Sequence, residues 1–181
     1  MINLNFTPFP IIYTERTVLR ELRHSDVNEY HFIRADEEMN KYINNPLPQT
    51  HEETIAIIDR MNSYATSNKS IAWAIADKET DKLLGSICIW TMYGTDDSWE
   101  LGYAMHAAHQ GKGLMREALL ASVNYGFNVM NLEVIHAHTH KDNTASIRLL
   151  EKAGFKRNPV LEENNPPEEK EFMTVYTLYR N

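Results

Sequence analysis

The sequence predicts a single mixed α/β domain, because segments with the period of a strand and segments with the period of a helix succeed one another along the chain. A chain of 181 residues is long enough to bury roughly 70% of the surface that its unfolded form exposes, which suffices for one sizeable core. Hydrophobic residues make up 43% and charged residues 24%, close to the globular average. We therefore expect one domain over residues 1–181.

The first half of the chain predicts a strand, two helices and a β-hairpin. Polar and apolar residues alternate at 15–22 and again within 70–91, where a polar turn divides two strands. The stretch Thr50-His51-Glu52-Glu53 is a capping box, in which a hydroxyl and a carboxylate each satisfy a free helix amide. Pro46 and Pro48 separate this helix from the preceding one. The helices are expected from Ser25 or Asp26 to Ala35 and from Thr50 to Ala65.

The second half alternates strands with helices. A strand over residues 98–106 leads into a helix whose apolar residues repeat with a period of 3.6 from Met115 to Met130, about five turns. A strand over residues 134–139 leads into a helix over 144–153, which Gly154 is expected to end in a left-handed conformation. The closing strand is expected at residues 171–180.

Composition and charge exclude several classes of protein. No apolar run approaches the roughly 18 residues that a membrane span needs, and the N-terminus lacks the pattern of a signal peptide. A net charge of −7 disfavours nucleic acid and weakly favours a cationic substrate. The single cysteine, Cys88, excludes an internal disulfide and is typical of a reducing compartment. We expect a cytoplasmic protein with neither a membrane nor a nucleic-acid partner.

A polar loop with two glycines, Gln110-Gly111-Lys112-Gly113, lies between a predicted strand and a predicted helix. The first amides of a helix have no intrahelical partner and the helix dipole is positive there, so a phosphate is the natural ligand. The spacing excludes a P-loop, and the third glycine of a dinucleotide fingerprint is replaced by Arg116. On these two glycines alone, an ordinary strand-to-helix turn is an equally good interpretation.

The flanking segments carry a resemblance that decides between these interpretations. ELGYAMHAAHQGKGLMREALLASVNYGF and NTASIRLLEKAGF resemble the GNAT superfamily of N-acetyltransferases, and more narrowly its RimJ/RimL-like branch of ribosomal-protein acetyltransferases. TERTVLREL is similar to that branch's first strand, and WAI…LLGSI to its second and third strands. The resemblance implies the GNAT fold, an α/β (α+β) arrangement with a central mixed, mostly antiparallel sheet of about seven strands flanked by about four helices.

The resemblance also implies acetyl-coenzyme A (acetyl-CoA) as cosubstrate. Gln110 to Met115 are similar to the (Gln/Arg)-x-x-Gly-x-(Gly/Ala) signature of the superfamily, although Met115 stands where Gly or Ala is usual and its side chain must turn away from the pyrophosphate. Amides near Met105 and His106 are implied to bind the pantetheine or the thioester oxygen. The expected cofactor-binding residues are Met105, His106, Gln110, Gly111, Lys112, Gly113, Leu114, Met115, Asn143 and Ser146.

A primary amine must lose a proton before it attacks a thioester, so a carboxylate base is expected near the acceptor. Glu100 is the candidate, because it opens the strand that resembles the family's fourth, whose carboxylates face the acceptor. Trp99 and Tyr103 are expected to make its surroundings less polar. The alternative is a strand-edge glutamate in water, since a slip of one residue would reverse its face.

The departing thiolate must be protonated, and most of the superfamily uses a tyrosine at the position of Leu150. The RimJ/RimL-like branch carries Asn-x-x-Ser instead, present here as Asn143-Thr144-Ala145-Ser146. Ser146 is therefore implied to lie beside the sulfur, and Asn143 to hold the pantetheine amides. A serine in the first turn of a helix and an asparagine that caps it are the alternative interpretations.

Three other groups of residues suggest sites less strongly. His136, His138 and His140 alternate on one face of a strand, but the sequence places no carboxylate or cysteine beside them, so packing is favoured and no metal is expected. Glutamates around two prolines predict a solvated hairpin loop, with an acidic lip for a basic acceptor as the alternative. They are Glu162, Glu163, Glu168, Glu169 and Glu171. Aromatic residues that could wall an acceptor groove, but are more often core, are Tyr42, Trp73, Trp90 and Tyr93, with the proline loop 44–48.

We therefore expect an acetyl-CoA-dependent N-acetyltransferase that acts by direct attack in a ternary complex. The acceptor is expected to be a primary amine, either a protein N-terminus or a small molecule. The alternative is a non-catalytic GNAT-like module that binds coenzyme A or a partner protein. Leu150 and Met115 favour this alternative, whereas Glu100 and Ser146 favour the enzyme. A monomer or a homodimer is expected.

Overall fold

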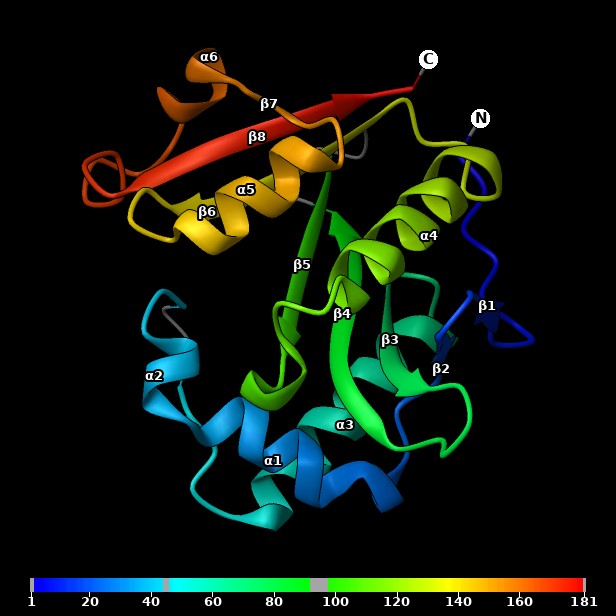
Figure 1. The fold of residues 1–181 in the computed structure, drawn as a ribbon. Coiled ribbons are helices and arrows are strands. Elements are labelled where there is room, and N and C mark those ends of the chain that lie inside the picture. Colours follow the sequence, from blue (N-terminus) through cyan, green and yellow to red (C-terminus); the bar gives the residue numbers. More distant parts are fainter. Residues whose placement is uncertain (1, 44–45, 92–97, 181) are drawn as a thin grey trace.

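The computed structural model describes residues 2–43, 46–91 and 98–180, in which one eight-stranded sheet carries helices on both faces (Figure 1). The strand order is β1-β2-β3-β4-β5-β6-β8-β7, and each neighbouring pair is antiparallel except β5 with β6. The strands are β1 (Ile12–Tyr13), β2 (Thr17–Arg20), β3 (Ser70–Asp77), β4 (Leu83–Thr91), β5 (Trp99–Met105), β6 (Val134–His140), β7 (Lys156–Arg157) and β8 (Met173–Tyr179). The predicted mixed, mostly antiparallel sheet is confirmed.

Six α-helices accompany the sheet in the described residues, where about four were expected. They are α1 (Val27–Ala35), α2 (Glu37–Asn40), α3 (His51–Thr66), α4 (Leu114–Asn128), α5 (Thr144–Lys152) and α6 (Pro159–Glu162), with 3-10 turns η1 (His24–Asp26) and η2 (Ala107–His109). The four long helices are the predicted ones. The elements that the sequence did not indicate are β1 and β7, of two residues each, and α2 and α6, of four each. Such segments are too short to show a period.

Two helix boundaries differ in detail from the expectation. The Thr50 hydroxyl accepts from the Glu53 amide at 3.2 Å, as a capping box requires, but the Glu53 carboxylate accepts from the amide of Gln49 at 2.7 Å, one residue before the cap. Helix α4 has 15 residues, about four turns rather than five, because Asn131 adopts a φ of 63° and turns the chain. The expected left-handed conformation of Gly154 is confirmed, with φ 94°.

The sheet separates two hydrophobic cores. On one face, α4 packs against β2, β4 and β6, around a core that includes Trp99, Leu101 and Met105 of β5. On the other face, α1 and α3 enclose a smaller core that is joined by Ala104 of β5. Successive strand residues point to opposite faces, so β5 presents its odd-numbered side chains to α4 and its even-numbered ones to α1.

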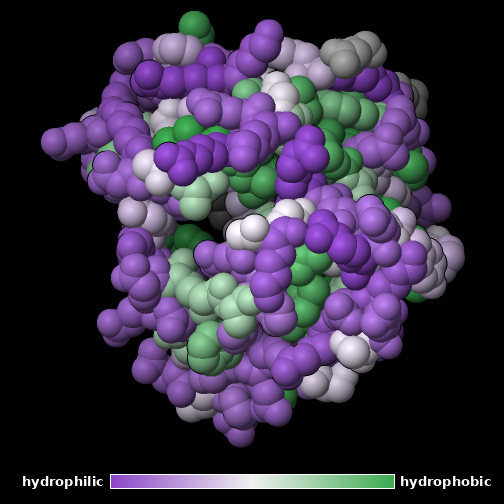
Figure 2. Space-filling model, in the orientation of Figure 1, coloured by the Kyte–Doolittle hydropathy of each residue, from purple (hydrophilic) through white to green (hydrophobic). Residues whose placement is uncertain are grey.

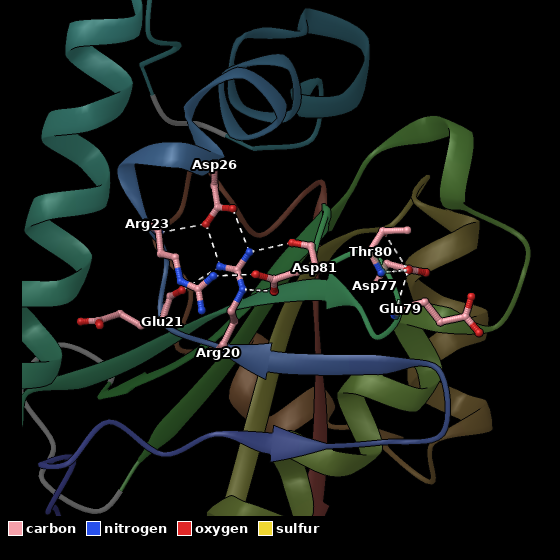
Figure 3. A network of polar contacts seen from close by, with 8 residues as sticks. All are labelled: Arg20, Glu21, Arg23, Asp26, Asp77, Glu79, Thr80 and Asp81. Atoms are coloured by element: carbon pink, nitrogen blue, oxygen red, sulfur yellow. Dashed lines mark hydrogen bonds and ion pairs between the residues drawn. The ribbon is translucent and has the colours of Figure 1, made fainter.

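A buried ion-pair network fixes β2 to helix α1 and to the turn between β3 and β4 (Figure 3). Arg20 is only 3% exposed and donates from both terminal nitrogens to Asp26, at 2.8 and 2.9 Å, and from Nε to Asp81 at 2.7 Å. A bidentate guanidinium–carboxylate pair sets distance and orientation together. The network therefore helps to hold α1 in place on its face of the sheet.

The predicted solvated loop of glutamates is wrong for Glu162, whose side chain is 13% exposed. Its carboxylate accepts two bonds from Arg157, both 2.8 Å, and one each from the hydroxyl of Thr174 and the amide of Val175. The Arg157 contact lowers the pKa of Glu162 to about 2. Short helix α6 brings this carboxylate onto β8, which the loop composition did not reveal. Glu163, by contrast, has a side chain that is 82% exposed.

We expect Glu162→Gln to destabilise the fold by about 2 kcal/mol at pH 7, because charge-assisted hydrogen bonds are lost at a largely buried site. The folded-state pKa is depressed, so the ionised carboxylate contributes stability above its ordinary value of 4.5 and loses that contribution as pH falls toward about 2. Urea unfolding between pH 7 and pH 3 measures the difference. Glu163→Gln is the matched control and should unfold like the wild type. A Glu162→Gln penalty that does not shrink with falling pH would contradict this.

Candidate active site

The two parallel strands β5 and β6 part soon after they meet. Their register comprises Trp99 with Ile135 and Glu100 with His136, after which β5 stays paired with β4 and β6 with β8. Figure 1 shows the two strands diverging. In Figure 2, in the same orientation, the surface is hollowed at that place, between the two halves of the molecule. This gap in the sheet exposes backbone groups that a closed sheet would pair.

The alternation of the antiparallel ladder decides which amides of β5 face the gap. The His106 amide donates to the Leu84 carbonyl at 2.9 Å and therefore points toward β4. The expectation that this amide is free to bind a ligand is wrong. The backbone groups of Met105 and Tyr103, one and three positions before His106, point away from β4 and into the gap. The Met105 carbonyl lies on that side and accepts from Nε2 of Gln110 at 2.9 Å.

The glycine loop and the start of α4 form a set of free amides. Gly111 and Gly113 have φ of 74° and 79°, left-handed values that a side chain would strain. The first hydrogen bond of the helix runs from the Glu117 amide to the Gly113 carbonyl, at 3.1 Å. Within the described residues, no hydrogen bond from the amides of the first helical turn is found. Those amides belong to Leu114, Met115 and Arg116. Their geometry fits an anion such as a pyrophosphate.

The turn between β1 and β2 braces this loop, a role that the sequence did not indicate. The Arg16 guanidinium donates to the Lys112 carbonyl at 2.9 Å and to the Glu117 carboxylate at 2.9 Å. The same carboxylate accepts from the hydroxyl of Thr14 and the amide of Arg16. Burial alone would raise the pKa of Glu117, but these bonds outweigh it and leave the pKa below its usual value. The carboxylate thus stays ionised and holds the loop.

The remaining side chains of the signature segment point away from the free amides or lie at the surface. Met115 and Leu114 are partly buried and pack against the core on the α4 side, as the bulk of a methionine at this position requires. Lys112 is exposed, and its ammonium group donates back to the Ala108 carbonyl at 2.8 Å. The side chain of Gln110 is bound to Met105, so it stabilises the end of β5.

Two hydroxyl groups join β5 to α5. The Tyr103 hydroxyl lies 2.8 Å from the Ser146 hydroxyl. Burial raises the pKa of Tyr103 to about 12, against the smaller opposing effect of Ser146, so the phenol stays protonated at neutral pH. Asn143 caps α5 by accepting from the Ser146 amide at 3.2 Å through its side-chain oxygen. Leu150 is fully buried in the core. The sequence indicated Ser146 but not its partner Tyr103.

Glu100 lies on the opposite face, which corrects the surroundings expected for it. Trp99 and Tyr103 are odd-numbered and point toward α4, whereas Glu100 points toward α1. Its carboxylate lies 3.2 Å from Nδ1 of His138, and both side chains are largely buried, at 17% and 15% exposure. Trp90 is paired with Glu100 across the ladder, and its ring lies over Gly102. This face of the gap thus presents a carboxylate beside a half-buried indole.

The other candidate side chains are separated by the fold. Trp73 is fully buried, and its ring nitrogen donates to Pro10, so it belongs to the core. Tyr42 stacks on His140 with ring centroids 4.8 Å apart, beside the β6 end of the gap. His136 lies 2.9 Å from the Thr177 hydroxyl. Among the described residues, no group of three or more His, Cys, Asp or Glu side chains could hold a metal ion. Tyr93 and residues 44–45 of the proline loop lie outside the described residues.

Comparison with known proteins agrees with this arrangement. Residues 16–156 match the family model described as "Acetyltransferase (GNAT) domain". The chain is 30% identical over 151 residues to a protein of Bacillus licheniformis named "Uncharacterized N-acetyltransferase p20", covering 83% of this chain and 84% of the relative.

Two solved structures share the fold at low sequence identity. The first is RimL, titled a ribosomal L7/L12 alpha-N-protein acetyltransferase in complex with coenzyme A, with a TM-score of 0.79, 15% identity, and 94% and 98% of the two chains covered. The second is spermidine N-acetyltransferase from Vibrio cholerae in complex with coenzyme A and spermine, with a TM-score of 0.74, 20% identity, and 90% and 95% covered.

Proposed function

Because the chain belongs to the GNAT acetyltransferase family, we propose that it moves an acetyl group from acetyl-CoA to a primary amine by direct attack within a ternary complex. The chain is an N-acetyltransferase, and acetyl-CoA is its cosubstrate. One observation carries the mechanism: the gap between β5 and β6 has Glu100 on one face of the sheet and the Tyr103–Ser146 hydroxyl pair on the other. An amine and a thioester can therefore approach from opposite faces and meet there.

The donor is expected along the gap and the start of α4. The free amides of the first helical turn, with Gly111 and Gly113 leaving space around them, suit the pyrophosphate of coenzyme A. The amides of Met105 and Tyr103 point into the gap, where they can bind the pantetheine or the thioester oxygen. The side-chain nitrogen of Asn143 remains available for the pantetheine while its oxygen caps α5.

The acceptor is expected to be a primary amine of a protein N-terminus or of a small molecule. The RimJ/RimL-like assignment within the family rests on the Asn143-x-x-Ser146 pattern and on the fold shared with RimL. The fold shared with the spermidine enzyme supports a small-molecule amine equally. A carboxylate on the acceptor face and a net charge of −7 both favour a cationic acceptor.

The chemistry divides between the two faces. Glu100 accepts a proton from the amine, which frees a lone pair for attack on the thioester carbonyl. The Ser146 hydroxyl, oriented by Tyr103, donates to the sulfur as the carbon–sulfur bond breaks. Because Tyr103 keeps its proton at neutral pH, it can donate to Ser146 while Ser146 serves the sulfur.

We also infer one domain over residues 1–181, because a single sheet runs from β1 to β8 through the described chain. Among the described residues, no helix combines the length and apolarity that crossing a bilayer would need. A single cysteine, whose pKa burial raises to about 12, is inert at neutral pH and suits the reducing cytoplasm. A monomer or homodimer is expected.

A thiol-release assay with acetyl-CoA across a panel of amines tests the function. The panel contains peptides with free N-termini, polyamines, amino acids and aminoglycosides. Release that depends on one acceptor class, with the acetylated product identified by mass spectrometry, supports the proposal. Binding of coenzyme A without release on any acceptor would instead favour the non-catalytic module.

Ser146→Ala should lower turnover by up to about 100-fold while acetyl-CoA affinity stays within a few-fold, because the hydroxyl serves only the departing thiolate. Steady-state kinetics and calorimetric titration measure the two quantities. Tyr103→Phe is the matched variant, since it removes the same hydrogen bond but keeps the Ser146 hydroxyl. It should retain more turnover than Ser146→Ala. Wild-type turnover in Ser146→Ala would mean that water protonates the thiolate.

A further inference from the structure

The contact between Glu100 and His138 joins the two strands on the acceptor side of the gap. Glu100 is in the last paired position of β5 and β6, opposite His136, and its Oε1 lies 3.2 Å from Nδ1 of His138, two residues further along β6. A carboxylate has two oxygens, so Oε1 can face the imidazole while Oε2 remains available to an acceptor. His138 therefore lies on the side of the Glu100 carboxylate away from the expected acceptor.

The groups around His138 come from three elements. Glu100 faces it from β5, His136 precedes it on β6, and Asn165 and Glu169 approach from the segment before β8. Burial by itself lowers the pKa of His138, but the Glu100 carboxylate, with help from Asn165 and Glu169, outweighs burial and raises the pKa above its ordinary value.

A lone carboxylate is a weak base for this reaction. An ordinary glutamic acid has a pKa of about 4.3 and an alkylammonium group about 10.4, so transfer between them is uphill by about six units. An ordinary imidazole, with a pKa of about 6.5, reduces that difference by about two units. Base catalysis improves as the pKa of the base approaches the working pH.

Resting on the function proposed above, we propose that His138 is the positioning residue through which Glu100 acts as the base: in its neutral form it lies against the carboxyl group and receives the proton that this group takes from the ammonium form of the acceptor. The acceptor ammonium carries three protons on nitrogen and the amide product carries one. One of the two protons lost ends on the thiol of coenzyme A. The other binds Oε2 of Glu100, and rotation of the protonated carboxyl group presents it to the unprotonated Nδ1 of neutral His138, from which it passes to solvent as the product leaves.

Neighbouring histidines lack this arrangement. His136 is directed to the Thr177 hydroxyl, and burial lowers its pKa, followed by the effect of His138. His140 lies 3.6 Å from Asp142, whose side chain is 80% exposed, and it stacks on Tyr42. Among the described histidines, only His138 forms an ion pair with Glu100, although His136 is its partner in the strand register.

The first test is the pH profile of His138→Asn, whose amide keeps a polar group beside Glu100 but cannot accept a proton. The low-pH inflection of kcat/KM should move toward acid, because the imidazole no longer receives the proton. At neutral pH, kcat should fall about tenfold or more with KM for acetyl-CoA unchanged. His24→Asn is the matched control, because it alters an exposed histidine 2.6 Å from Asp59 on another part of the surface, and its profile should be that of the wild type.

The second test needs no activity and remains valid if His138→Asn folds poorly. The pKa of His138 in the wild type and in Glu100→Gln is followed by NMR of its ring. Removing the carboxylate leaves burial as the main effect, so the pKa should fall from above to below 6.5. An identical pKa in both proteins, or a parallel pH profile for His138→Asn, would overturn the proposal while leaving the acetyltransferase function intact. A wild type that binds coenzyme A but releases no thiol would instead overturn the function, and with it the reaction that the pair serves.

Discussion

Gly113→Asp should weaken coenzyme A binding by more than 100-fold. The substitution puts a negative charge beside the free amides of the first turn of α4, where the helix dipole and the amides favour an anion. Calorimetric titration with coenzyme A measures the loss. Thermal unfolding provides a second measure, since ligand at 100 times its dissociation constant stabilises the wild type by about 2.7 kcal/mol and should not stabilise the variant.

Gly113→Ala separates charge from backbone strain. Both variants force a side chain onto a φ of 79°, and the added carbon would lie 3.4 Å from Arg16 in each, but only aspartate adds charge. The alanine variant should lose about 1 kcal/mol of stability and retain most of its affinity. Affinity for coenzyme A unchanged in Gly113→Asp would place the pyrophosphate elsewhere. Equal losses in both variants would mean that loop conformation, and not electrostatics, controls binding.

Glu100→Gln should reduce kcat/KM by about 100-fold or more near neutral pH, because the amide keeps the size of the side chain but cannot accept a proton. The loss should shrink as rising pH deprotonates the amine without help. Above about pH 9, as free amines begin to lose their protons, the variant and the wild type should converge. The measurement is the full pH profile on the best acceptor of the panel.

The shape of the profile distinguishes a base from a structural glutamate. Glu100→Gln should lack the low-pH inflection altogether, whereas His138→Asn should only move it. Affinity for acetyl-CoA should stay unchanged, since Glu100 lies on the face opposite the hydroxyl pair. Parallel profiles at every pH would make Glu100 structural. The base would then be sought at exposed Glu163 or in an ordered water, because Glu162 is held by Arg157 and Thr174.

The sequence predicted every element long enough to show a period. The Thr50 cap, the hairpin over 70–91 and the left-handed Gly154 all follow from interactions within a few residues, and the structure contains each of them, although the Glu53 carboxylate accepts from Gln49 and not from Thr50. The sequence also predicted the glycine loop before α4, since Gly111 and Gly113 adopt left-handed backbone conformations that only glycine takes without strain. Local propensity suffices for such features because their partners are close in the chain.

The surroundings of the site could not be predicted from the local sequence. Trp99 and Tyr103 were expected beside Glu100, but strand alternation puts them on the other face, where Tyr103 meets Ser146. The His106 amide was expected to be free, but it donates a hydrogen bond to the Leu84 carbonyl beside β5. The alternation was visible in the sequence. The sequence did not show which helix covers which face of the sheet.

The sequence by itself thus determined the order of the elements, the position of the glycine loop before α4 and the choice of Glu100 and Ser146 as candidates. Only the tertiary structure decided their partners. His138 meets Glu100 because β5 and β6 pair in parallel for two positions and then diverge, and Arg16 braces the loop from about 100 residues away in the chain. These contacts depend on strand register and chain crossing, which fix side chains distant in sequence relative to one another and leave no periodic signal in any single segment.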